Sequence, residues 1–166
     1  DIGVDAIREH VVNNLNGLRI APYYGCQIVR PDKTFDDKED PVLLDKMFAI
    51  CGGESVYFPM KVRCCGGMLM TTFEDTALAL NRDLLQCAVD NGADVIVTTC
   101  PLCHFNLEGY QSKINKRFGT RFNIPILYFT QLLGLAFGLS AKSLGLDASF
   151  IPMGRKITSI AEAHYA

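Results

Sequence analysis

Short runs of β-branched and aromatic residues recur along this chain, separated by longer stretches in which apolar positions repeat at helical spacing. The short runs predict four strands, which cover Leu18 to Tyr24, Ser55 to Pro59, Asp94 to Thr98 and Pro125 to Phe129. The third of these, DVIVT, has the composition of a buried parallel strand.

The stretches between the strands predict helices. They cover Asp1 to Leu15, Pro41 to about Ile50, Glu74 to Asn91, Pro101 to about Phe118 and Gln131 to Leu139, with one more short helix and a loop within residues 140–151. No element is predicted for residues 155–166.

Strands that alternate with helices predict an α/β fold, in which a short parallel sheet of about four strands is flanked by helices in three layers. The chain has 166 residues, which is enough for one domain with a buried core. We expect an N-terminal helix and linker over residues 1–17, a cysteine-rich domain over 18–150 and a C-terminal tail over 151–166.

Charge and hydropathy narrow the classes of partner. The formal net charge is -2 and no basic stripe is present, so we expect no nucleic-acid partner. The longest apolar run, Ile126 to Leu139, is shorter than the roughly 20 residues that span a bilayer, so we expect no membrane span. No signal peptide is visible, and a chain that begins at Asp1 rather than Met is typical of a segment of a longer protein.

Seven cysteines set this chain apart from an ordinary α/β domain. Their number is odd and they cluster as Cys-Cys and Cys-x-x-Cys, which favours metal or redox chemistry in a reducing compartment over structural disulfides. Five come at or just beyond the ends of the first three predicted strands, namely Cys26, Cys64, Cys65, Cys100 and Cys103. In parallel sheets ligands collect outside the carboxyl ends of the strands, so we expect these thiols at one edge of the sheet.

The neighbours of these thiols support a shared site. Gly66 and Gly67 permit the chain to turn after the paired cysteines, because glycine adopts positive φ without a Cβ penalty. Pro101 suits the first turn of a helix, so Cys100 and Cys103 are expected where the helix dipole favours thiolate. Spacing alone leaves open whether this pair chelates a metal or closes a disulfide.

Two kinds of metal site fit the five thiols. Zinc would need four of them and would form a closed structural site. An iron-sulfur cluster uses thiolates, which matches a region without a histidine pair at ligand spacing, and a larger cluster accommodates the fifth thiol. We interpret His104 as a packing residue or a partner of a ligand, and Cys51 and Cys87 as buried structural thiols.

Charged residues near the cysteines fall into two groups. The acidic residues of the run 36–40 lack the alternating offsets and the glycine turn of a hard-cation loop, which predicts a solvated loop. Arg30, Lys61 and Arg63 flank the five cysteines, where they either bind an anionic substrate or offset a cluster's negative charge, or else have a plain solvated or ion-paired role.

The cysteine pattern C-x37-CC-x34-C-x-x-C, with Gly66 after the paired cysteines, resembles the CCG domain of the heterodisulfide reductase B-subunit family. The stretches APYYGCQIVRP, CCGG, GADVIVTTCPLCHFNLE and FTQLLGLAFGL carry the resemblance, which covers Leu18 to Leu146. Members of this family usually carry two CCG repeats, and this chain resembles the second of them.

The resemblance implies a non-cubane [4Fe-4S] cluster, itself the catalytic group, held by the matching residues Cys26, Cys64, Cys65, Cys100 and Cys103. It implies a disulfide oxidoreductase subunit that reduces or forms a disulfide of small thiol cofactors or sulfur substrates in one-electron steps, as in methanogenesis and sulfur metabolism. The implied partners are A- and C-type iron-sulfur and flavin subunits. The implied location is the cytoplasm, with membrane association through those partners.

The same domain occurs in other respiratory complexes, which keeps alternatives open. In complexes that oxidise succinate, glycolate or lactate, a CCG domain serves in electron transfer or anchoring. A zinc-stabilised assembly domain without chemistry of its own is a third reading. Because one repeat of the family's two is recognised, the isolated chain need not be active.

Overall fold

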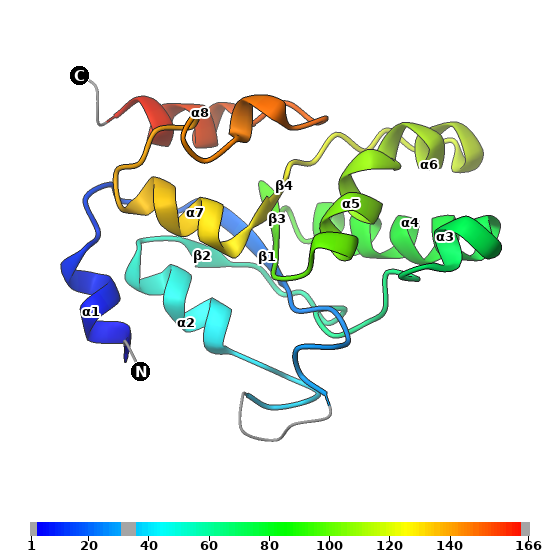
Figure 1. Cartoon of the computed structure of the whole chain (residues 1–166), viewed down its shortest axis with the longest axis horizontal. Coiled ribbons are helices and arrows are strands. Elements are labelled where there is room, and N and C mark those ends of the chain that lie inside the picture. Colours follow the sequence, from blue (N-terminus) through cyan, green and yellow to red (C-terminus); the bar gives the residue numbers. More distant parts are fainter. Residues whose placement is uncertain (1–2, 31–35, 164–166) are drawn as a thin grey trace.

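Four parallel strands form the centre of the molecule (Figure 1). They are β1 (Arg19–Tyr23), β2 (Glu54–Ser55), β3 (Val95–Thr98) and β4 (Ile126–Tyr128), hydrogen-bonded in the order β2-β1-β3-β4. β1 and β3 make the central pair, in register from Ile20 opposite Val95 to Tyr23 opposite Thr98. This computed structural model describes residues 3–30 and 36–163, so the first two residues of the predicted N-terminal helix, residues 31–35 and the last three residues of the tail lie outside the described residues.

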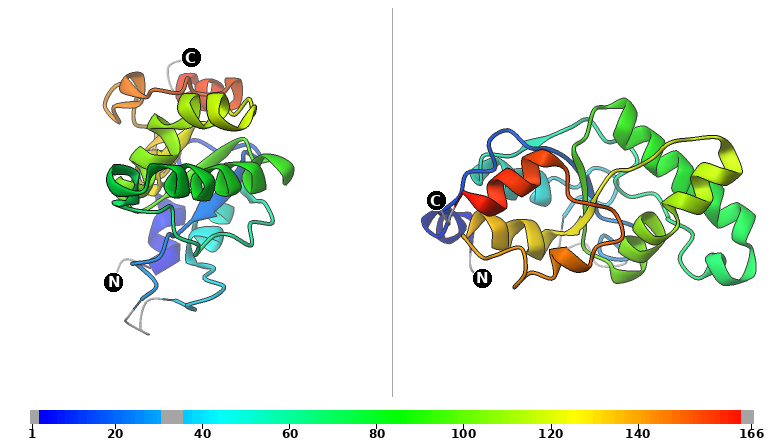
Figure 2. Two further views of the ribbon diagram at one scale, coloured as in Figure 1. Left: turned by 90° about the vertical axis from the view of Figure 1, so that its right-hand side faces the viewer. Right: turned by 90° about the horizontal axis from the view of Figure 1, so that it is seen from above.

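Helices cover both faces of the sheet, as the two further views in Figure 2 also show. One face carries α1 (Gly3–Glu9), α2 (Leu43–Ile50), α7 (Phe129–Ala136) and α8 (Arg155–Glu162). The other carries α3 (Leu69–Thr72), α4 (Glu74–Asp90), α5 (Pro101–Gly109) and α6 (Gln111–Phe118). A short 3-10 helix, η1 (Leu146–Ala148), lies between α7 and α8 in the chain.

Side chains of the strands alternate between the two hydrophobic clusters. Val95 and Val97 pack with α2, α7 and α8, whereas Ile96 between them packs with the cluster under α4, α5 and α6. This alternation is the period of two that a strand imposes when both of its faces are covered. The predicted three-layer α/β fold is therefore confirmed.

Two elements differ from the prediction. The second strand is shorter, and the helix over 101–118 is divided in two. The second strand is limited to β2, since the chain beyond Val56 leaves the sheet towards Pro59, which has no N–H to donate. The predicted helix over 101–118 is two helices that meet at Tyr110. The buried Gln111 side chain explains the break, because its Nε2 donates to Leu107 O (3.0 Å) and Ile124 O (2.8 Å).

The ends of the chain also differ from the prediction. The first helix ends at Glu9, because the following residues run along α7 and the N–H groups of Val12 and Asn13 both donate to Ala136 O at 2.9 Å. Helix α8 lies in the tail, for which the sequence pattern predicts no element, and it buries Ile157 and Ile160 against the same cluster as α7.

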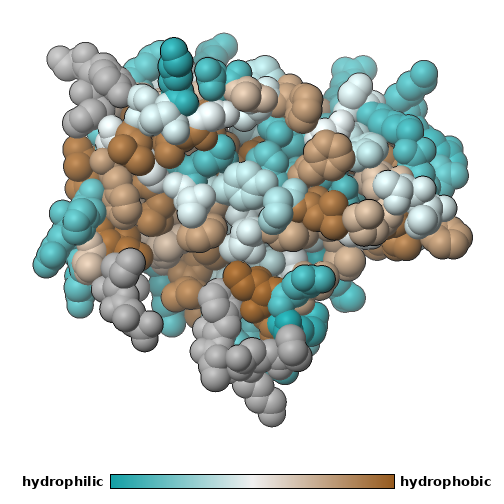
Figure 3. All heavy atoms as spheres, in the orientation of Figure 1, coloured by the Kyte–Doolittle hydropathy of each residue, from teal (hydrophilic) through white to brown (hydrophobic). Residues whose placement is uncertain are grey.

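The surface is mixed in character. In the orientation of Figure 1, hydrophilic residues gather over α6, while hydrophobic and hydrophilic residues are interspersed elsewhere (Figure 3). Within residues 3–30 and 36–163, no helix is long and apolar enough to cross a membrane.

Candidate metal and redox site

The segments that follow β1, β2 and β3 are joined to one another beyond the carboxyl edge of the sheet. The N–H groups of Tyr24 and Gly25 both donate to Lys61 O, at 2.9 and 3.1 Å, and the Tyr23 hydroxyl donates to Arg63 O at 2.7 Å. Thr99 Oγ1 donates to Tyr24 O at 3.4 Å. These bonds hold the three cysteine-bearing segments together although β2 ends well before Cys64.

The paired cysteines lie on a tight turn. Gly66 and Gly67 have φ values of +87° and +49°, as the sequence predicts for a turn at this point. The turn directs backbone N–H groups at both thiols: Gly66 N lies 3.3 Å from Cys64 Sγ and Gly67 N lies 3.5 Å from Cys65 Sγ. Such amide contacts favour sulfur in its negatively charged form.

The five predicted ligands meet as neighbouring pairs. Cys65 Sγ and Cys103 Sγ are 3.4 Å apart, Cys26 lies beside Cys64, and Cys100 lies beside Cys103. The other two cysteines lie elsewhere, with Cys51 buried at the end of α2 and Cys87 half-buried on α4. All seven cysteines fall within the described residues and all are free thiols.

The two buried thiols differ in their acidity. The hydrogen bond between Cys65 and Cys103 lowers the pKa of Cys65 to about 6, with further help from Gly67 N–H and Asn106. The same bond and burial raise the pKa of Cys103 far above its usual range. The pKa of Cys65 thus lies below that of Cys103, because burial and the neighbouring Cys65 sulfur outweigh the helix dipole at Cys103.

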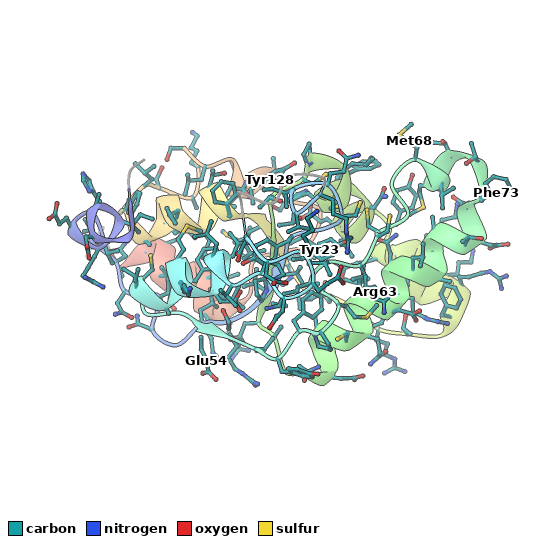
Figure 4. The ribbon with its side chains drawn as sticks, turned by 90° about the horizontal axis from the view of Figure 1, so that it is seen from below. Tyr23, Glu54, Arg63, Met68, Phe73 and Tyr128 are labelled. Atoms are coloured by element: carbon teal, nitrogen blue, oxygen red, sulfur yellow. The ribbon has the colours of Figure 1, made fainter. Side chains whose placement is uncertain are left out.

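A buried phenol lies next to this pair. Tyr23 is fully buried at the end of β1, and burial together with the charges of Cys103 and Cys65 raises its pKa well beyond the ordinary value of a phenol. The hydroxyl thus keeps its proton, which it donates to Arg63 O. Figure 4 shows Tyr23 and Arg63 close to each other, whereas Met68 and Phe73 lie at the far end of the molecule near α3.

The site is closed on one side and open on the other. Cys65 and Cys103 are only 3% and 4% exposed, whereas Cys64 is exposed and Cys26 and Cys100 are half-buried. Two hollows flank the open side. One of about 280 Å³ is lined by Tyr24, Cys26, Gln27, Ile28, Thr99, Cys100 and Cys103. The other, of about 340 Å³, is lined by Cys26, Arg30, Glu39, Pro59, Val62, Arg63 and Cys64.

The three flanking cations differ in their partners. Lys61 is mostly buried and contacts Asp40 Oδ1 at 3.0 Å, and Arg30 pairs with Glu39 at 2.6 Å. Arg63 is exposed and lines the second hollow beside Cys64. Of these three, Arg63 is the cation whose side chain faces the hollow with no ion pair among the described residues.

His104 packs against Tyr128 and Glu108. Its ring stacks on Tyr128 with centroids 4.3 Å apart, and its Nδ1 lies 3.8 Å from Glu108 Oε2. Burial lowers the pKa of His104 and raises that of Glu108, so both side chains favour their neutral forms.

Several residues contact the site although the sequence pattern does not predict them as part of it. Asn106 Nδ2 lies 3.7 Å from Cys65 Sγ, and Asn81 Nδ2 donates to Cys65 O at 2.7 Å. At Gly25 a Cβ atom would lie 3.1 Å from Cys103 Sγ, which explains a glycine there. The one available hint is helical spacing, since Asn106 follows Cys103 by three positions on α5 and shares its face.

Amide N–H groups are directed at the thiols of the site. The thiols lie in pairs along one edge, and their donors are the amide N–H groups of Gly66, Gly67 and Asn106. Sulfur ligands with N–H donors suit an iron-sulfur group.

The fold and the site define a class, an α/β domain that gathers thiols beyond the carboxyl edge of a short parallel sheet. Residues 20–108 match the CCG cysteine-rich domain, and the chain belongs to this family. A solved structure, a hypothetical protein from Helicobacter pylori, has the same fold, with a TM-score of 0.69 at 16% identity, covering 91% of this chain and 28% of that one.

Two relatives show where such domains occur. The B subunit of ferredoxin:CoB-CoM heterodisulfide reductase from Methanosarcina mazei is 34% identical over 155 residues, which cover 91% of this chain and 51% of the relative. The 8-methylmenaquinol:fumarate reductase membrane anchor subunit from Wolinella succinogenes is 31% identical over 150 residues, covering 89% and 53%. The chain thus spans about half the length of these relatives.

Proposed function

We propose that this chain is the cluster-binding segment of a B-type subunit in a disulfide oxidoreductase complex. In this proposal Cys26, Cys64, Cys65, Cys100 and Cys103 hold a non-cubane [4Fe-4S] cluster. The observation that carries it is the arrangement of five thiols from three segments at one edge, with the amide N–H groups of Gly66 and Gly67 directed at two of them.

When bound, such a cluster supplies single electrons. Reduction of a disulfide takes two electrons and two protons and yields two thiols, and the reverse reaction returns them. The electrons come from partner subunits of the iron-sulfur or flavin class, corresponding to the A- and C-type subunits. The residues of this chain hold the sulfur ligands, lower the pKa of Cys65 and cover the inner side of the site from water.

The open side is where a small substrate approaches. Cys64 is exposed, and the hollow beside it is lined by Arg63, whose guanidinium is available to a carboxylate, sulfonate or phosphate on a thiol substrate. A substrate sulfur therefore reaches the site from the side of Cys26 and Cys64, the more exposed thiols. Membrane association of the complex comes through the partner subunits, and this segment lies on the cytoplasmic side.

Metal and acid-labile sulfide analysis of anaerobically prepared protein tests the proposal. We expect about four irons with matching sulfide, and an EPR spectrum that changes when a small thiol is added under oxidising conditions. Cys64→Ser is expected to remove most of the iron and sulfide, whereas the matched control Cys87→Ser, on α4, is expected to retain both. Unchanged iron in Cys64→Ser would contradict the shared site.

A second function is favoured by the similarity to the fumarate reductase anchor subunit. In that case the domain transfers electrons or stabilises the assembly of a respiratory complex, and zinc can replace the cluster in the structural role. About one zinc per chain without sulfide would support a structural domain. A full cluster whose EPR spectrum ignores added thiol would support electron transfer.

A further inference from the structure

Two fully buried asparagines hold the turn that carries Cys64 and Cys65. Asn81 lies on α4 and is 0% exposed, and Asn106 lies on α5 and is 1% exposed. Each donates to a carbonyl of the turn: Asn81 Nδ2 to Cys65 O at 2.7 Å, and Asn106 Nδ2 to Gly67 O at 3.0 Å. The two amides thus connect the turn to different helices on the same face of the sheet.

The two asparagines differ in what their remaining amide hydrogen reaches. The second partner of Asn81 Nδ2 is another carbonyl, Ala77 O at 2.7 Å, within its own helix. The second partner of Asn106 Nδ2 is Cys65 Sγ, at 3.7 Å. Asn106 is therefore the side-chain amide that joins the turn and the sulfur atom.

The orientation of the Asn106 amide follows from its surroundings. Its Oδ1, like that of Asn81, is buried without a hydrogen-bond partner, which is a cost that native structures seldom keep without reason. A flipped amide would place Oδ1 against Gly67 O, so that one acceptor would face another, and would remove the N–H contact with Cys65 Sγ. In the observed orientation Oδ1 has no hydrogen-bond partner, and both N–H groups of the amide are directed at the turn.

We propose that Asn106 is a positioning residue that sets the reduction potential of the group bound by Cys65, through its N–H contact with that sulfur. The inference rests on the proposed function, because it requires a redox-active cluster at these thiols. Reduction adds negative charge to a cluster and its sulfur ligands, and an N–H dipole directed at one ligand stabilises that charge. Removing the donor makes reduction less favourable, so the potential becomes more negative.

The matched pair of variants is Asn106→Leu and Asn81→Leu. Both replace a buried amide by an apolar side chain of similar volume and release one carbonyl of the turn, but only Asn106→Leu removes a contact with sulfur. EPR-monitored redox titration of the cluster-loaded protein gives the potential, while thermal unfolding and sulfide content report stability and loading.

For Asn106→Leu we expect an about tenfold lower ratio of reduced to oxidised cluster at a fixed potential, which corresponds to about 59 mV for one electron. For Asn81→Leu we expect a lower unfolding temperature with the potential unchanged. Equal potentials in wild type and Asn106→Leu, or equal shifts in both variants, would overturn the proposal.

A measurement on the wild-type protein decides the case if Asn106→Leu does not keep its cluster. With asparagine labelled with ¹⁵N in the side-chain amide, pulsed EPR is expected to show a hyperfine coupling between the cluster and an amide nitrogen, and its absence would overturn the role of Asn106. Wild-type protein that binds no iron and sulfide would contradict the proposed function as well, whereas a loaded cluster without the coupling would contradict this inference alone.

Discussion

Gly25 and Gly145 have the same backbone φ of +69° but different surroundings. A Cβ atom at Gly25 would lie 3.1 Å from Cys103 Sγ, whereas at Gly145 it would meet nothing within 4 Å. The pair therefore separates the cost of a left-handed backbone from the cost of crowding the site.

Alanine at either position is expected to lower the free energy of unfolding by about 1–2 kcal/mol, the cost of a Cβ atom at left-handed φ. Only Gly25→Ala is expected also to reduce metal loading, because the added methyl group displaces Cys103 Sγ. Urea unfolding and metal analysis of both variants check this, and equal metal loading in the two would show that the contact with Cys103 has no effect on the site.

At the scale of elements, Gln111 decides where α5 ends and how α6 joins the sheet. Its side chain is 0% exposed, donates to Leu107 O and Ile124 O, and accepts from Ile124 N at 3.1 Å. It thereby satisfies both backbone groups of a residue just before β4. Two helices and the approach to a strand depend on one amide group.

Gln111→Met keeps the approximate volume and removes these bonds, so the free energy of unfolding is expected to fall by about 2 kcal/mol or more, since buried backbone groups lose their partners. Gln86→Met is the control, because that amide donates to Asp90 on the surface of α4 and its loss is expected to cost less than about 0.5 kcal/mol. Similar losses in the two variants would disprove the structural role of Gln111.

The elements differ in how far the sequence predicts them, for physical reasons. α4 is predicted to within a residue, since its apolar face and the Asn91-Gly92 stop are local signals. The break at Tyr110 is not, because it depends on a contact between Gln111 and Ile124, which a local pattern does not contain. A strand as short as β2 has too few residues for a reliable period of two.

The residues of the site also differ in how far the sequence predicts them. The five cysteines could be assigned to one edge because strand ends in a parallel sheet share a side. Asn81 and Asn106 could not, because a buried asparagine in a helix interrupts the apolar pattern in the same way as a solvated one. What distinguishes them is a partner on a turn brought near by the fold.

At the scale of the whole molecule, Glu108 links α5 to the segment before α8. Its side chain is 5% exposed and lies beside the backbone N–H groups of Phe150 and Ile151, while its Oε1 has no hydrogen-bond partner. Burial raises the pKa of this carboxyl above its unfolded value. The folded state therefore holds the proton more tightly than the unfolded state.

The raised pKa of Glu108 makes the folded state less stable as pH rises. As pH rises from the unfolded pKa of the carboxyl through its folded pKa, the unfolded state loses its proton first and stability falls. Glu108→Gln is expected to be more stable than wild type at pH 7 to 8, with the gain vanishing below about pH 4. Urea midpoints measured across this range check it, with the exposed Glu162→Gln on α8 as control. A gain that is independent of pH would contradict the burial argument.

The five thiols differ in exposure: Cys65 and Cys103 are almost fully covered, whereas Cys64 is exposed and Cys26 is half-buried. In the proposed function, an incoming metal group therefore meets Cys26 and Cys64 first, and chelators and oxidants attack the same outer pair first. The side proposed for substrate entry is then also the side from which the site is assembled and damaged.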